Sequence, residues 1–250
     1  MRARPVILAL ALIAAALPAR AAPEVSAHFA APTDRYGHGA LGPEHEFAKL
    51  VVTVTRPGSG PSPAVERKSY TITAAADMVF EDTAPRLADL DGDGFEEVIV
   101  VESSLTKGSR VAVFGLATGA PTRIAATEFV GEPNHWLAPI GIADLDGNGE
   151  PDLALIDAPH RLGILRIYAF RDGALHQIYQ GGRLSNHHYG ASRILGGIRD
   201  CGSGPQMVVA RFDWGRFYAL RLSADGRVFQ TDLGRDTSSA AFDAARACKI

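Results

Sequence analysis

Two acidic stretches of this sequence repeat each other at a long, regular spacing. Residues 86–101 read RLADLDGDGFEEVIVV and residues 141–156 read GIADLDGNGEPDLALI, with Asp89 and Asp144 lying 55 residues apart. A shorter copy that has lost most of the acidic residues follows at 197–209. A period in the fifties that carries several short strands is typical of a propeller or another repeat array. The repeat therefore constrains the fold more than any other feature of the chain.

Each repeat is expected to form four strands. The apolar runs predict strands at 84–89, 97–102, 109–115 and 122–129, then at 137–144, 152–157, 163–170 and 174–180, then at 193–200, 206–212, 215–222 and 227–233. The dipeptides Asp172-Gly173 and Asp225-Gly226 are hairpin turn signals between two of these runs. The second strand of each repeat is apolar throughout, as expected for a strand that is buried on both faces.

The predicted fold class is all-β, a small β-propeller of about four blades that are four-stranded antiparallel sheets. The predicted blades are 34–80, 81–133, 134–190 and 191–236, within a domain that spans 22–250. The first blade is divergent: alternating apolar residues between Ala48 and Val54 predict one strand, Ser69–Thr73 its partner, and 56–63 a flexible connection. The Ala-rich tail, 237–250, is expected to be either a short helix or the strand that closes the ring.

The first acidic stretch has the residue pattern of a metal-binding loop. Asp89, Asp91 and Asp93 occupy positions 1, 3 and 5, Gly94 occupies position 6, and Glu97 occupies position 9. A tight loop turns alternate residues inward, and glycine at position 6 permits the sharp turn that brings a backbone carbonyl to the ion. Calcium takes six to eight oxygen ligands, which such a loop and water can supply.

The second stretch repeats this pattern. The predicted ligands of two calcium sites are the side chains of Asp89, Asp91, Asp93 and Glu97 with the carbonyl of Phe95, and the side chains of Asp144, Asp146, Asn148 and Asp152 with the carbonyl of Glu150. The loop is not an EF-hand, because position 12 is apolar and strands are predicted on both sides. The alternative is a pair of Asp/Gly-rich turns that bind no ion, and the matched register of two copies disfavours it.

These loops resemble FG-GAP/VCBS repeats, which also occur in the propeller of integrin α subunits. The resemblance is strong over 84–102 and 139–157, plausible over 193–212 and weak before residue 80. It implies a β-propeller with calcium in the hairpin between the two inner strands of a blade. The integrin type usually has seven blades, whereas this chain has room for about four. The family includes adhesion and ligand-binding modules, lectin-like proteins and parts of enzymes, so the resemblance does not name a substrate.

The N-terminus predicts export. Arg2 and Arg4 precede an apolar run, and residues 19–21 form a small-x-small cleavage pattern, so 1–21 is expected to be a signal peptide cleaved near Ala21. An uncleaved anchor is the alternative, but the run is short for a membrane span. Cleavage would leave 22 Lys and Arg against 28 Asp and Glu. A net charge of −6 argues against nucleic-acid binding. The predicted location is the periplasm or the extracellular space.

The two cysteines are expected to pair. Cys201 lies in the decayed third loop and Cys248 lies near the C-terminus, and an even cysteine count in an exported protein favours a disulfide. The alternative is two separate buried thiols.

No sequence motif identifies a catalytic site, and no catalytic residue is assigned. Polar and aromatic residues precede the inner strands of several repeats, and in a propeller these positions lie near one mouth of the central channel, where a binding site can form. The candidate ligand-binding residues are His38, Asn134, His135, Trp136, Asn186, His187 and Trp214. Strand caps and loop hydrogen bonds are the alternative role for them.

The sequence therefore favours a calcium-binding module outside the cytoplasm that binds a protein or glycan ligand or serves as a scaffold. Whether the protein is an enzyme is left open, with a non-enzyme favoured. The main alternative is a small periplasmic hydrolase or lyase with its site at the channel mouth, using His38, His135 or His187. A structural accessory domain of an envelope complex is a third hypothesis.

Overall fold

A computed structural model of the protein describes residues 23–42, 45–57 and 64–250. The predicted signal peptide, 1–21, and most of the predicted flexible connection, 56–63, lie outside these residues. The elements are β1 (Glu24–Pro32), β2 (Glu46–Pro57), β3 (Val65–Thr73), β4 (Met78–Glu81), β5 (Arg86–Ala88), β6 (Glu97–Ser104), β7 (Gly108–Gly115), β8 (Thr122–Ala126), β9 (Leu137–Ala143), β10 (Asp152–Asp157), β11 (Ile164–Arg171), β12 (Ala174–Gly181), β13 (Leu184–Ser185), β14 (Gly197–Asp200), β15 (Pro205–Arg211), β16 (Phe217–Leu222), β17 (Val228–Gly234) and α1 (Ser239–Arg246).

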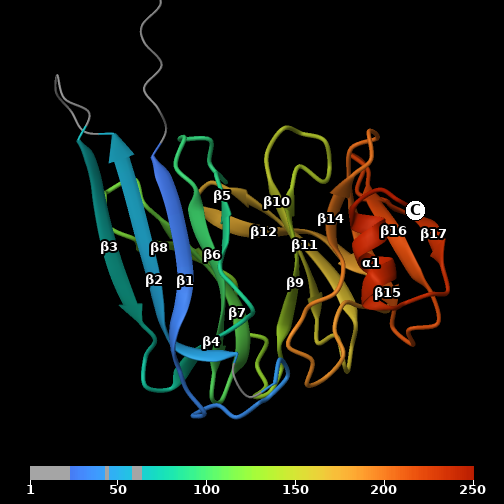
Figure 1. The fold of residues 1–250 in the computed structure, drawn as a ribbon, viewed down its shortest axis with the longest axis horizontal. Helices are drawn as coiled ribbons and strands as arrows, with labels where there is room; N and C mark the ends of the chain where they lie inside the picture. Colours follow the sequence, from blue (N-terminus) through green and yellow to red (C-terminus); the bar gives the residue numbers. More distant parts are fainter. Residues whose placement is uncertain (1–22, 43–44, 58–63) are drawn as a thin grey trace, which may run out of the picture.

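Three sheets follow one another along the chain (Figure 1). The first has the order β1-β2-β4-β6-β7-β8, with β3 on β2 and β5 on β6; the second is the meander β9 to β12; the third runs β13-β15-β16-β17, with β14 on β15. The strand pairings are antiparallel. The predicted all-β fold class, with propeller-type antiparallel sheets and a short C-terminal helix, is confirmed.

The sheets pack face to face, and the strand that follows each acidic loop, β6 or β10, is buried on both faces. On β6, Val98 and Val100 belong to the core shared with β1–β3, whereas Ile99 and Val101 belong to the core shared with the second sheet. Successive residues of a strand point to opposite faces, so an unbroken apolar run is what a strand between two layers requires. The buried run of β10 meets the same need in the middle of the stack.

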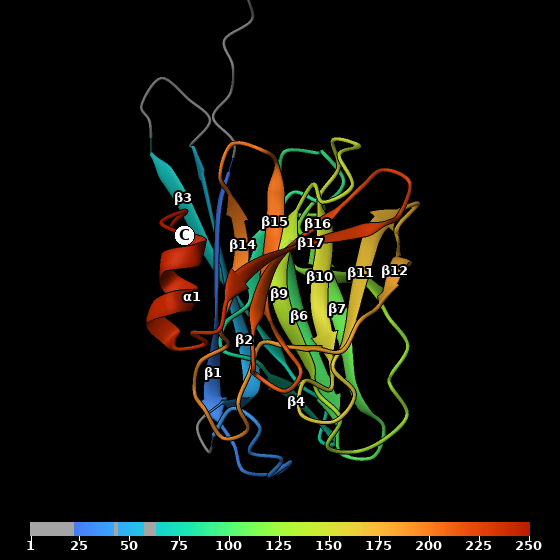
Figure 2. The ribbon, with the colours of Figure 1, turned by 90° about the vertical axis from the view of Figure 1, so that its right-hand side faces the viewer.

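The stack ends on a helix. Val208 and Ala210 of β15 turn away from the second sheet and pack against Phe242 of α1, which is fully buried. The side chain of Ser238 caps the helix by accepting a hydrogen bond from the backbone N–H of Ala241. Figure 2, seen from the C-terminal side, shows α1 beside β14 and β15. The sequence predicted either a short helix or a closing strand for the C-terminal tail, and the tail forms the helix.

The inner strand of a blade differs between repeats. In the second sheet it is one strand, β9, with a bulge, whereas the first and third sheets divide the same position between β4 and β5 and between β13 and β14. The residues between β13 and β14 form a loop that reaches the N-terminal segment: the backbone N–H of Gly190 donates to the carbonyl of Ala40 at 2.8 Å. The sequence analysis predicted strands at 84–89 and 193–200, where β5 and β14 lie, and it missed the short strands β4 and β13.

The N-terminal strands are attached to the first repeat rather than separate from it. β2 pairs with β3 as predicted, and it also pairs with β4, which in turn pairs with β6. β1 begins at Glu24, ahead of the predicted first blade, and pairs with β2 along its length. The division into four blades stays a prediction, since β1–β3 stack as a layer but share a ladder with the blade beside them.

Two further findings concern the cysteines and the helices. Cys201 and Cys248 form a disulfide with an S–S distance of 2.02 Å, which confirms the predicted pairing. Within the described residues, no helix is long and apolar enough to cross a membrane.

Candidate functional site

The two acidic loops are strand-loop-strand hairpins. The first joins β5 to β6 and the second joins β9 to β10, so strands flank both loops, as the sequence predicted. Gly94 and Gly149 have φ values of 86° and 92°, a conformation that a side chain disfavours. The turn at position 6 therefore depends on glycine in both copies.

In the first loop, backbone amides hold the carboxylates in place. Asp89 accepts hydrogen bonds from the backbone N–H of Gly92 at 2.8 Å and of Gly94 at 3.0 Å. Asp91 accepts one from the backbone N–H of Asp93 at 3.1 Å. The loop thus orients its acidic side chains with main-chain donors, which leaves carboxylate lone pairs free for an ion.

The second loop repeats the same contacts at equivalent atoms. Asp144 accepts from Gly147 at 2.8 Å and from Gly149 at 3.0 Å, and Asp146 accepts from the backbone N–H of Asn148 at 3.1 Å. Two loops whose equivalent residues are 55 positions apart have therefore folded into the same geometry. This agreement is expected when local sequence alone determines the loop.

The acid at position 9 is buried in both loops. Glu97 accepts from the backbone N–H of Leu90 at 2.8 Å, and Asp152 accepts from that of Leu145 at 3.1 Å. Burial, with the neighbouring aspartates, raises the pKa of Glu97 to about 7 and that of Asp152 to about 6. Each loop thus concentrates negative charge in a place where an ionised carboxylate is unstable without a cation.

One buried oxygen in the second loop has no partner in the described part of the chain. Asp152 is fully buried, and its Oδ1 accepts no hydrogen bond from residues 23–42, 45–57 or 64–250. A buried polar atom without a partner costs roughly 1–3 kcal/mol, so such an atom usually contacts water or an ion. The residues present therefore fit a hard cation, which oxygen ligands of this kind prefer.

Each loop brings three carboxylates together. Oxygens of Asp89, Asp91 and Glu97 lie within 4.8 Å of one another, and so do oxygens of Asp144, Asp146 and Asp152. Either cluster could hold a metal ion. The predicted ligand roles of Asp93, Asn148 and the carbonyls of Phe95 and Glu150 stay predictions. In the structure Asp93 and Asn148 accept hydrogen bonds from the backbone N–H groups of Phe95 and Glu150, at 2.8 and 2.7 Å.

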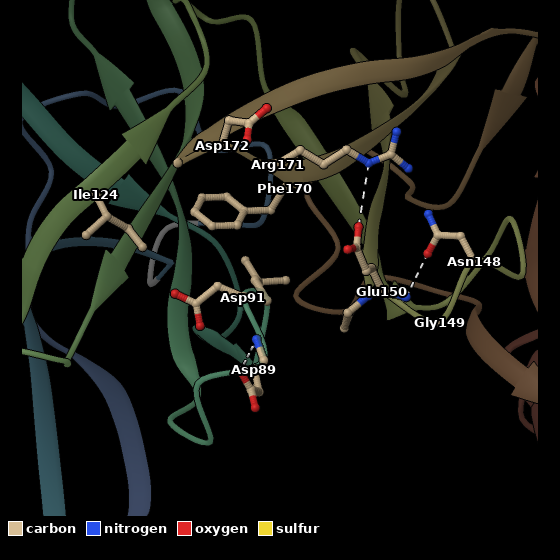
Figure 3. A pocket seen from close by; sticks show the side chains of 13 residues that line it. Asp89, Asp91, Ile124, Asn148, Gly149, Glu150, Phe170, Arg171 and Asp172 are labelled. Carbon is tan, nitrogen blue, oxygen red and sulfur yellow. Dashed lines mark hydrogen bonds and ion pairs between the residues drawn. The ribbon is translucent and has the colours of Figure 1, made fainter.

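A cleft of about 1030 Å³ separates the two loops (Figure 3). Asp89 and Asp91 line one side, Glu150 lines the other, and the turn between β11 and β12 closes the end. Arg171 from that turn approaches Asp146 and Glu150 at 3.6 Å each. This is the one cationic side chain among those that line the cleft, so the walls are acidic overall.

The third loop has lost the cluster. Asp200 keeps the role of the first aspartate, because its Oδ1 accepts from the backbone N–H of Gly202 at 2.8 Å and of Gly204 at 3.1 Å. No other carboxylate follows it in the loop, and the next residue, Cys201, bonds to Cys248. Cys201 takes the place of Leu90 and Leu145 in the other loops, so a covalent link to the C-terminal tail anchors the loop that lacks the acidic cluster.

Some of the predicted ligand-binding residues do come together. His38 Nδ1 and Glu81 Oε1 are hydrogen-bonded at 2.6 Å, and the Trp136 indole N–H donates to the carbonyl of Glu81 at 2.9 Å. The Trp136 and His187 rings lie edge to face, with centroids 5.0 Å apart. His160, which the sequence reasoning missed, hydrogen-bonds to His187 at 2.9 Å.

Burial governs the ionisation of this cluster. Burial lowers the pKa of both His160 and His187 to about 4, and it raises the pKa of Glu81. His187 Nε2 donates to the carbonyl of Ala191, so its Nδ1 accepts from His160. At neutral pH the His160 and His187 rings are therefore both uncharged and hydrogen-bonded to each other.

The remaining candidates lie elsewhere. His135 turns to Asp157, the Asn186 side chain donates to the carbonyls of Ala138 and Pro139, and Trp214 stacks on His188. Asn134 makes its contact through the backbone, whose N–H donates to the Tyr36 hydroxyl at 2.7 Å.

The two Asn-His pairs are not repeat equivalents. Leu137 lies opposite Asp157, and Leu184 lies opposite Arg211, so the ladders match Leu137 with Leu184. His135 precedes Leu137, whereas His187 follows Leu184. The expectation that such residues precede an inner strand therefore fails for Asn186-His187, because the strand begins with β13 and the break between β13 and β14 places this pair after it.

Comparison with known proteins supports the repeat. Residues 89–155 match the FG-GAP-like repeat family. No curated protein matches the chain in sequence. Among solved structures, an exotype rhamnogalacturonan lyase, YesX, is similar with a TM-score of 0.42 and 15% identity, over 88% of this chain and 50% of that chain. This chain thus spans about half the length of that lyase.

Proposed function

Because this chain carries FG-GAP-like repeats, we propose that it is an exported, calcium-binding β-propeller module that binds a protein or glycan partner or serves as a scaffold. The observation that carries the proposal is the pair of superimposable carboxylate clusters, one of which contains the buried, unpartnered Oδ1 of Asp152. The disulfide between Cys201 and Cys248 and the signal-like start of the sequence support export.

Calcium has a structural role in this proposal. Burial, and in addition the repulsion between carboxylates crowded into one hairpin, raises the pKa of Glu97 and of Asp152. A divalent cation removes the repulsion and fixes the turn between two inner strands. Asp89, Asp91 and Glu97 would hold one ion, and Asp144, Asp146 and Asp152 the other. Metal binding then contributes directly to the free energy of folding.

We expect two calcium-binding events of unequal affinity, with the tighter one in the first loop. That loop has four acidic side chains among its predicted ligands and the second has three, and ligand charge is one factor that tunes calcium affinity. Isothermal titration of the metal-free protein should show loss of the tighter event in Asp89→Ala and of the weaker event in Asp144→Ala. Asp225→Ala, in an exposed turn of the third sheet, should keep both events. Equal losses in the two loop variants would refute the ranking.

The binding role is tested by the calcium dependence of partner capture. The purified protein, immobilised with calcium and separately with EDTA, is exposed to a glycan array and to extracellular protein extracts. A calcium-stabilised module should retain its partner in calcium and lose most of it in EDTA, because the loops between inner strands loosen. Identical capture under both conditions would show that partner binding does not depend on the metal loops.

A further inference from the structure

A second cleft lies away from the metal loops, between the first and second sheets. It has a volume of about 690 Å³. One wall is the segment 126–132 that continues β8, and the other is formed by the ends of β10, β11 and β12. This size is within the usual range for small-ligand sites.

A hydrogen-bonded network forms the floor of this cleft. Asp157, which is 1% exposed, receives His135 Nε2 on one oxygen and Arg166 on the other, at 2.7 Å from Nε and 2.6 Å from Nη2. Arg166 also donates to Gln177 at 2.8 Å. Although burial alone would raise the pKa of Asp157, its bonds with His135 and Arg166 lower it. The aspartate is therefore ionised, and it neutralises the guanidinium.

The other ring nitrogen of His135 has no partner among the residues that the structure describes. His135 is 6% exposed and lines the cleft, and its Nδ1 forms no hydrogen bond with any of them. A carboxylate can only accept, so Nε2 carries the hydrogen that Asp157 receives, and we assign the other ring nitrogen, Nδ1, as an acceptor. A buried acceptor of this kind needs a donor from water or from a ligand.

The rim of the cleft also offers acceptors. Glu128 and Glu132 are exposed on its edge, and Glu132 uses one oxygen for Arg161 at 2.7 Å. The Phe129 ring, which also lines the cleft, already receives the Arg110 guanidinium at 4.4 Å from its centroid. An anion would meet carboxylates here and a guanidinium that is already paired, so the chemistry disfavours it.

We propose that this cleft binds an organic cation that donates hydrogen bonds, an alkylammonium or guanidinium group such as a Lys or Arg side chain of a protein partner presents. The donor satisfies His135 Nδ1, and its charge is met by Glu128 and Glu132. The proposal rests on the proposed function and deepens it, because it states the chemistry of the partner. The positive charge of Arg166 does not oppose the ligand, since Asp157 neutralises it.

The test uses n-butylguanidinium chloride as the probe, titrated into the calcium-saturated protein and followed by ¹H–¹⁵N NMR. Saturable shifts are expected at the His135 ring nitrogens and at amides of 126–132. Glu128→Gln should weaken binding about fivefold, the upper range for one exposed ion pair. Because Glu128 is exposed, this variant leaves the buried network intact. Glu24→Gln, an exposed acid on β1, should bind as the wild type does.

Three results would overturn the proposal: shifts that do not map to the cleft, unchanged affinity in Glu128→Gln, or equal binding of the neutral sugar methyl glucoside. A sugar that binds while the cation does not would make the cleft a glycan site instead. The calcium titration separates this failure from failure of the proposed function. If calcium binds and the probe does not, only the cleft assignment fails; if the probe binds a protein that takes up no calcium, only the metal role fails.

Discussion

Removing calcium is expected to lower the melting temperature of this protein by about 15 °C or more. A ligand present at a thousand times its dissociation constant stabilises the native state by about 4 kcal/mol per site, and two carboxylate clusters are available. One kcal/mol corresponds to roughly 2–4 °C in a domain of this size. Calorimetry in millimolar calcium and in excess EDTA measures the difference.

The variant that best isolates this effect is Asp152→Asn. The substitution keeps the size of this fully buried side chain. It removes the negative charge of the carboxylate, whose Oδ1 has no partner among the described residues. About half of the calcium-dependent shift should disappear, while Asp225→Asn, in an exposed turn, should keep the whole shift. A wild-type melting temperature that is equal in calcium and EDTA would contradict a structural role for the metal.

The acidic loops were predictable because their geometry is local. Alternate carboxylates, a glycine at position 6 and an acid at position 9 determine the turn without help from the rest of the chain, and the two copies adopt the same hydrogen bonds. The strands of the repeats were predictable for a similar reason, since an apolar run bounded by turn residues has few alternatives. The disulfide followed from an even cysteine count.

The contacts of the histidines were not predictable from the sequence. His135 meets Asp157 because the pairing of β9 with β10 places Leu137 opposite Asp157, and His187 meets His160 because the strand before it ends early. A shift of one residue in either ladder would exchange the two faces of a strand. Sequence spacing placed both histidines at one channel mouth, but it could not show which side chain each of them contacts.

The element that covers the outer face of the last sheet was also not predictable from the sequence pattern. The apolar run of β15 indicates a strand with two buried faces, but it does not say what covers the second one. A returning strand or a helix would both serve. The C-terminal segment forms a helix whose buried residues, Ala241, Phe242 and Ala245, cover that face.

Phe242→Ala is therefore expected to destabilise the protein by about 3–5 kcal/mol, the usual cost of truncating a fully buried phenylalanine. The ring packs against Phe217 with centroids 5.0 Å apart and against Trp214 at 6.1 Å, so its removal leaves a cavity over β15 and β16. Urea unfolding in saturating calcium measures the loss without a contribution from partly filled metal loops.

Phe229→Ala is the matched control, because Phe229 on β17 is 50% exposed and makes no part of that core. Its cost should stay near 1 kcal/mol or below. The disulfide tethers the tail in both the folded and the unfolded chain, so it cannot mask the lost packing. If Phe242→Ala were as mild as the control, α1 would be a peripheral attachment. The outer face of the last sheet would then need another cover, and a closing strand or a partner would again be required.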